Sequence, residues 1–195
     1  MQNFLRSEFR PGFFISLAFF LLLLPLQWLL ALLFAAGFHE MCHLLALKAC
    51  GGHPNTICLG ATGAVICANP LSPGRAIFCT LAGPIGSLSL VLLAPYFQRL
   101  ALCALIQSVY NLLPLHNLDG GHALEDFLSL FLLPKTVNSL CRITEGCLFI
   151  VTIILSLYAT FILHLGLLPI LIAGNIVIKV TEGKFPCKTR PMRVQ

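Results

Sequence analysis

The sequence predicts an all-α polytopic membrane protein with about six transmembrane helices and a short β-hairpin between the second and the third. Hydrophobic residues make up 58% of the 195 residues, charged residues only 10%, and the mean hydropathy is +0.93. A soluble domain carries about 25% charged residues, so this chain cannot cover a water-facing surface. The same composition excludes a disordered chain, a nucleic-acid-binding module and a secreted disulfide scaffold, and no nucleic-acid partner is expected.

The first two spans are expected in the apolar tract from Gly12 to Ala49. As one helix this tract would be about 57 Å long, roughly twice the hydrocarbon core of a bilayer. We therefore expect a break near Pro25 and Gln27, because proline interrupts a helix. The tract would then form two spans.

The segment 49–74 is rich in glycine and proline and is expected to be a loop. Within it, residues 56–67 are predicted to form the short β-hairpin. The following uncharged runs, 76–98 and 100–118, are each long enough for one span. Asn111 and Pro114 are expected to interrupt the helix of the second run. The last run, 146–178, is long enough for two spans, with a break expected around His164.

The basic residues give the expected orientation. With six spans both termini lie on one side, and eleven of the twelve Lys and Arg residues fall on that side; the exception is Arg99. By the positive-inside rule both termini are assigned to the cytoplasm. Nine cysteines form no CxxC pair and are expected to be free thiols, and a bond between Cys58 and Cys67 is not expected in a reducing compartment.

The second expected span contains the sequence His39-Glu40-Met41-Cys42-His43. Two histidines at i and i+4 of a helix point to one face, where their ring nitrogens can bind one zinc ion. Glu40, beside the first histidine, can take a proton from an activated water molecule. Ionisable groups within an apolar span are functional by default. These residues therefore predict a catalytic zinc site rather than polar residues that happen to lie in a helix.

A catalytic zinc ion usually has three protein ligands, so a third is needed. Asp119 is the candidate, because it is expected at the inner end of the span 100–118, at a depth similar to that of His43. His116 and His122 flank Asp119 and remain competing candidates. The alternative for Asp119 is a carboxylate that ends a helix before the Gly-Gly turn.

Three motifs in this order resemble the site-2 protease family of intramembrane zinc metalloproteases. They are the HExxH helix, the segment AlaGlyProIleGlySer at 82–87, and AsnLeuLeuPro followed by LeuAspGlyGly within 111–121. The resemblance covers roughly residues 30–125 and is greatest to the small six-span branch typified by stage IV sporulation protein FB. The resemblance implies a single membrane-embedded metalloprotease domain over 1–195, with accessory spans in 146–178 and a basic cytoplasmic tail at 179–195.

The resemblance also implies the roles of individual residues. His39, His43 and Asp119 would bind one Zn²⁺ per chain, and Glu40 would be the catalytic base. Asn111 would help to hold the substrate or the oxyanion. In one place the sequence departs from the family, since Asn117 stands where many members have proline two residues before the aspartate.

The leading hypothesis is therefore a zinc endopeptidase of the bacterial cell membrane that hydrolyses peptide bonds of membrane-spanning or membrane-associated proteins. Because no PDZ or CBS segment is found, we expect control by regulatory membrane proteins or by substrate supply. Two alternatives stay open: a non-catalytic metal-binding or transport protein, and an inactive relative that acts as an adaptor. The absence of Asp, Glu, Lys and Arg from most of the apolar runs argues against transport, and the presence of Glu40 argues against an inactive relative.

Overall fold

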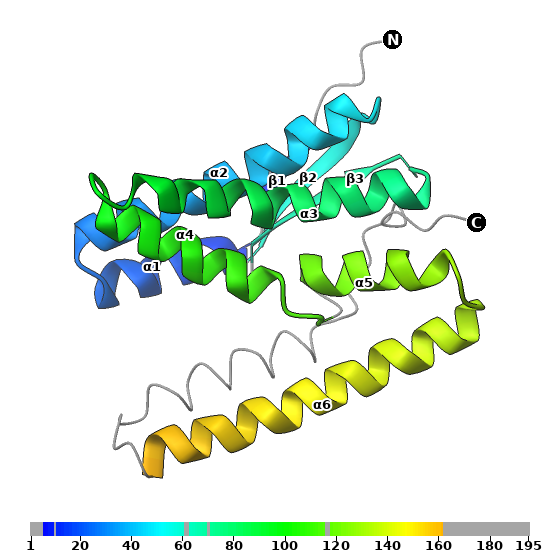
Figure 1. Cartoon of the computed structure of the whole chain (residues 1–195). Coiled ribbons are helices and arrows are strands. Elements are labelled where there is room, and N and C mark those ends of the chain that lie inside the picture. Colours follow the sequence, from blue (N-terminus) through cyan, green and yellow to red (C-terminus); the bar gives the residue numbers. More distant parts are fainter. Residues whose placement is uncertain (1–5, 10, 61–62, 70, 116–117, 162–195) are drawn as a thin grey trace. The chain divides into compact units, whose positions relative to one another are not determined.

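The computed structural model describes residues 6–9, 11–60, 63–69, 71–115 and 118–161 (Figure 1). These residues fall into two compact units, one that ends at Leu112 and one that begins at Leu113. The break predicted around His164, the part of the run 146–178 beyond Phe161 and the tail 179–195 lie outside the described residues. The single domain over 1–195 stays a prediction.

Four α-helices build most of the first unit: α1 (Pro11–Leu23), α2 (Leu26–Ala49), α3 (Pro73–Ser89) and α4 (Gln98–Asn111). The expected break between the first two helices is present at Leu24 and Pro25, and Pro25 has a non-helical backbone with ψ 142°. The helix α3 begins three residues before the uncharged run 76–98 and continues as a short 3-10 helix, η1 (Leu90–Leu93).

The fourth expected span is shorter than predicted, and this is a correction. The helix α4 has 14 residues and ends at Asn111, so the helix is interrupted where Asn111 and Pro114 were expected to interrupt it. It does not continue to Asp119, which was expected to end the same span. At 1.5 Å per residue α4 is about 21 Å long, less than the roughly 30 Å hydrocarbon core. Pro114 explains the early end, because it disfavours helical backbone at the preceding residue and cannot donate a hydrogen bond.

A three-stranded sheet joins the loop between α2 and α3 to the N-terminal segment. The strands β2 (Pro54–Gly60) and β3 (Gly63–Ala68) are antiparallel over the segment where the hairpin was expected. A third strand, β1 (Arg6–Phe9), pairs in parallel with β2 and gives the order β1-β2-β3. The strand β1 was not predicted from the sequence, because a four-residue strand carries little pattern and its partner lies about 50 residues away.

The register of the hairpin also bears on the cysteines in it. Cys58 lies opposite Val65, and Cys67 lies opposite Thr56. The two cysteines are thus not directly opposed across the strands, and the absence of a bond between them stays an expectation.

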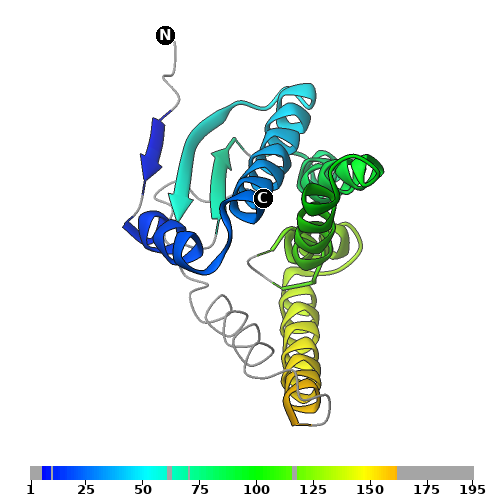
Figure 2. The same cartoon turned by 90° about the vertical axis from the view of Figure 1, so that its left-hand side faces the viewer.

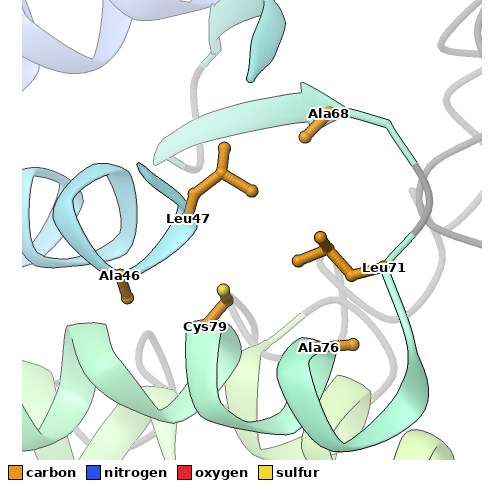
Figure 3. Packing of buried hydrophobic residues seen from close by; sticks show 6 residues of the cluster. All are labelled: Ala46, Leu47, Ala68, Leu71, Ala76 and Cys79. Atoms are coloured by element: carbon orange, nitrogen blue, oxygen red, sulfur yellow. The ribbon is translucent and has the colours of Figure 1, made fainter. Parts of the chain in front are cut away.

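The helix α2 lies at the centre of the first unit. Figure 2 shows it with the sheet on one side and with α3 and α4 on the other. A buried cluster joins its last turns to β3, to the loop that follows and to α3 (Figure 3). The cluster consists of Ala46, Leu47, Ala68, Leu71, Ala76 and Cys79. The alanines of this cluster allow the close packing of α2 and α3, because small residues let helix backbones approach closely.

A second cluster lies further along α2. It consists of Ala35 from α2, Leu90 from η1 and Ala104 from α4, and both alanines are fully buried. The two clusters fix α2 against α3 and α4 at both ends of the segment that carries His39, Glu40 and His43. This segment therefore lies on a packed helix and not on a loop.

The second unit contains α5 (Asp119–Ser129) and α6 (Pro134–Phe161), which pack against each other. The helix α6 starts 12 residues before the uncharged run 146–178, so Lys135, Arg142 and Glu145 lie within it, which corrects the expected start of the fifth span. At 28 residues the helix is about 42 Å long and exceeds the hydrocarbon core, so its charged first turns can remain outside it.

Three helical segments among the described residues are long and apolar enough to cross a membrane: Leu26–Ala49, Pro73–Leu93 and Pro134–Tyr158. Large apolar side chains are exposed along these helices, for example Leu30, Phe78 and Ile154. Water would not solvate such surfaces favourably, whereas lipid chains do. The described residues are thus those of an integral membrane protein, and the full count of six spans stays a prediction.

Candidate metal centre

The helix α2 brings His39 and His43 together. Because it is continuous from Leu26 to Ala49, residues four apart lie on one face, one turn above the other. The Nε2 atoms of the two rings are 3.1 Å apart, and the ring centroids are 4.8 Å apart at an interplanar angle of 79°. The side chain of His39 is buried, and that of His43 is half-buried.

The other nitrogen of each ring is held by α3. His43 Nδ1 lies 2.8 Å from the carbonyl oxygen of Cys79, which can only accept a hydrogen bond, so Nδ1 carries the proton. His39 Nδ1 lies 2.9 Å from Ser87 Oγ. Since this hydroxyl donates its own proton to the carbonyl of Gly83 at 2.8 Å, it accepts from His39 Nδ1. These partners select the tautomer of each ring that carries its proton on Nδ1.

This protonation pattern tests whether the site fits a metal ion. With the protons on Nδ1, both Nε2 atoms present lone pairs across 3.1 Å, and neither neutral ring can donate a hydrogen bond to the other. A cation bound by both nitrogens removes this repulsion. Two nitrogens at 2.0–2.1 Å from a tetrahedral zinc ion are about 3.3 Å apart, close to the observed separation. The histidine pair fits the metal.

Glu40 and Asn111 are placed near this pair by different helices. Glu40 follows His39 in α2 and is half-buried. Asn111 is the last residue of α4, and its Nδ2 atom lies 3.4 Å from His39 Nε2. The packing of α4 against α2 therefore brings the amide of Asn111 to the nitrogen that faces the metal position.

Asp119 lies in the second unit, where it is the first residue of α5 and is half-buried. From the sequence, Asp119 was expected to end a span. In the structure it begins a helix instead, after an extended Leu118. The reason is again the early end of α4. Its carboxylate is an oxygen donor of the kind that zinc sites combine with histidine nitrogens.

The competing acidic and histidine candidates are less suited as ligands. His122 is exposed, and His116 lies outside the described residues. Asp126, further along α5, is half-buried. Burial is the main cause that raises the pKa of its carboxyl group to about 6, and the nearby charge of Glu125 adds to it. A carboxyl group held closer to its neutral form is a weaker metal ligand than an ionised one.

Glycines in α3 explain how close α3 comes to α2. A Cβ atom on Gly83 would lie 2.1 Å from His43 Nε2, and one on Gly86 would lie 2.3 Å from Cys42 Sγ. Both distances are far below van der Waals contact. The two glycines therefore let α3 pack closely against α2, and the atom accommodated at Gly83 belongs to a candidate metal ligand.

We expect Gly83→Ala to weaken zinc binding at least about tenfold. The added Cβ atom would lie 2.1 Å from His43 Nε2, so the imidazole would have to move by more than about 1 Å to reach ordinary contact. Metal–ligand distances tolerate a change of only about ±0.2 Å. Zinc affinity is measured by competition with a chelator. Gly37→Ala is the matched control and should retain affinity, because Gly37 lies in α2 and a Cβ atom added there would have nothing within 4 Å. Equal affinities of the two variants would contradict the steric argument.

The contributions of Ser87 and of the Cys79 carbonyl were not predicted from the sequence. Ser87 is part of the motif at 82–87, but a hydroxyl on a helix carries no signal of what it faces. A backbone carbonyl carries none at all, because every residue has one. Only the packing of α3 on α2 reveals these partners.

The fold was compared with known protein families, curated proteins and solved structures. No protein-family model matches the sequence, and no curated protein matches it by sequence. Among solved structures, the site-2 protease from Methanocaldococcus jannaschii matches with a TM-score of 0.64 and 18% sequence identity. The match covers 97% of this chain and 93% of that one. The chain thus has the fold of a site-2 protease, and the resemblance indicated by the motifs is confirmed for the fold.

Proposed function

We propose that this protein is an intramembrane zinc metalloendopeptidase that hydrolyses peptide bonds of membrane-spanning or membrane-associated proteins. The observation that carries the proposal is the histidine pair on α2, whose Nε2 lone pairs converge within a helix that is long and apolar enough to cross a membrane. A carboxylate adjoins the pair, and the fold is that of a site-2 protease.

In this proposal His39, His43 and Asp119 bind one zinc ion. Two neutral imidazoles and one carboxylate leave one position of a tetrahedral ion open, which is the arrangement of catalytic zinc sites. When bound, zinc supplies a Lewis acid that polarises the scissile carbonyl group and lowers the pKa of a water molecule. The hydrogen bonds that Nδ1 of each ring makes with α3 favour the tautomer that this role requires.

Glu40 is the proposed general base. Its carboxylate takes a proton from the attacking water, whose oxygen bonds to the carbonyl carbon. Glu40 then gives the proton to the departing amine nitrogen as the C–N bond breaks. Asn111 is proposed to donate its amide N–H to the substrate carbonyl oxygen, which gains negative charge in the transition state. Its distance of 3.4 Å from His39 Nε2 supports this role.

The substrate must be extended when it is cut, because a helix hides its peptide bonds in internal hydrogen bonds. The sheet offers a means to hold an extended segment. Among the strands that the structure describes, in the order β1-β2-β3, β3 lies at an edge and can pair with an added strand through backbone hydrogen bonds. The small six-span branch, the bacterial cell membrane, cytoplasmic termini and regulatory membrane partners are parts of the same proposal.

Cleavage by purified protein in lipid vesicles tests the proposed function. The wild-type protein should hold about one zinc ion per chain and cut at least one of a panel of membrane-tethered peptides. His43→Ala should lose most of the metal and all detectable cleavage, because the remaining ligands bind zinc weakly. Metal content and fragment masses are the measurements. Full activity of the wild-type protein after exhaustive chelation would contradict the zinc assignment, and zinc binding without any cleavage would favour a non-catalytic metal-binding protein.

A further inference from the structure

Ser87 occupies an unusual position in α3. Its side chain is fully buried, and its Oγ atom makes two hydrogen bonds, one donated to the carbonyl of Gly83 at 2.8 Å and one accepted from His39 Nδ1 at 2.9 Å. The bond to Gly83 spans one helical turn and so fixes the direction of the hydroxyl proton. As a result, the lone pairs of Oγ remain for His39.

This arrangement decides which nitrogen of His39 can bind a metal ion. A neutral imidazole carries one proton, and the nitrogen that carries it cannot be a ligand. With Oγ as an obligatory acceptor, the proton stays on Nδ1 and Nε2 is left with its lone pair. In a buried site within an apolar helix pair, no bulk water can replace the acceptor if the hydroxyl is removed.

We propose that Ser87 is a positioning residue that holds His39 as the Nδ1-protonated tautomer with Nε2 aimed at the metal. The inference rests on the proposed function, since it takes His39 as a metal ligand. It assigns a task that neither the histidine motif nor the fold assigns. Hydrogen-bond partners of metal-bound histidines typically change metal affinity by 10- to 100-fold when they are removed.

Ser108 provides a matched control in the same unit. It is also fully buried, and its Oγ donates to the carbonyl of Ala104, four residues before it, at 2.7 Å. It lies on α4 and has the same helical hydrogen bond as Ser87. The difference is that Ser87 also accepts from a candidate metal ligand.

The first test compares the zinc affinities of Ser87→Ala and Ser108→Ala with that of the wild-type protein by chelator competition in detergent or vesicles. Ser87→Ala should bind zinc about 10- to 100-fold more weakly, and Ser108→Ala should stay within about threefold of wild type. Ser87→Thr keeps a hydroxyl and should recover affinity relative to Ser87→Ala. Equal affinities of the two alanine variants would overturn the proposal. If the wild-type protein itself bound no zinc, the proposed function would fail instead.

A second measurement does not depend on how well a variant folds. In the zinc-loaded wild-type protein with isotope-labelled histidine, the Nδ1 proton of His39 should give a nuclear magnetic resonance signal protected from exchange with water. A His39 Nδ1 proton that exchanges as fast as that of an exposed histidine, or a ring bound to zinc through Nδ1, would overturn the proposal.

Discussion

Replacing Glu40 by glutamine is expected to lower turnover by about two to four decades while zinc stays bound. Glutamine has nearly the size and shape of glutamate, so α2 and the two histidines beside it should remain in place. Its amide oxygen cannot take the proton of the attacking water at neutral pH. General acid–base catalysis by a positioned side chain typically contributes two to four decades in rate.

The measurement is initial cleavage rate in vesicles, together with metal content for each preparation. Glu145→Gln is the control, because Glu145 is also half-buried in a helix but lies in α6, in the other unit. It should retain both zinc and turnover. Near-normal turnover of Glu40→Gln would mean that another group accepts the proton.

The contrast between α2 and α4 shows which parts of the fold can be predicted from sequence. The break at Pro25 and the i, i+4 placement of His39 and His43 follow from local rules, since proline stops a helix and a helix has 3.6 residues per turn. The end of α4 at Asn111 is equally local, because Pro114 follows. The interruption at Asn111 and Pro114 is therefore predictable, but the uncharged run continues past the proline and placed Asp119 at the end of the same span instead of at the start of α5.

Long-range pairing was beyond prediction for a different reason. The strand β1 is short, and it is defined by pairing with β2 rather than by a pattern of its own.

The start of α6 was misplaced for another reason. The helix begins well before the last uncharged run, because charged residues are tolerated in the end of a helix that extends beyond the hydrocarbon core.

The candidate site divides in the same way. Its ligands carry rare, ionisable side chains at a fixed spacing, so the sequence marks them. Its supports are a serine, a glycine and a backbone carbonyl, which are common and acquire their roles only through the packing of α3 on α2. Candidate metal ligands are therefore easier to predict than the residues that orient them.

Asp119→Asn is expected to weaken zinc binding strongly and to abolish detectable cleavage. Two imidazoles alone leave a tetrahedral zinc ion short of a protein ligand, and the sequence has only seven acidic residues. Asparagine keeps the shape of the side chain but replaces an anionic oxygen by a neutral one. An anionic oxygen is the better ligand for a divalent cation, so its loss should lower zinc occupancy as well as rate.

The helix α5 itself supplies the controls. Glu125 and Asp126 follow Asp119 by six and seven residues, which places them about 9 and 10 Å further along the helix axis. A carboxylate there cannot share a metal ion with Asp119 through bonds of about 2.0–2.2 Å. Glu125→Gln and Asp126→Asn should therefore keep both zinc and cleavage.

His122 provides the decisive comparison, because it lies three residues after Asp119 and shares its face of α5. Zinc affinity and cleavage rate are measured for Asp119→Asn and His122→Ala under the same conditions. We expect the first variant to lose both and the second to keep both, since the side chain of His122 is exposed. The opposite pattern would assign the third ligand to His122 and leave Asp119 as a carboxylate that stabilises the N-terminus of a helix.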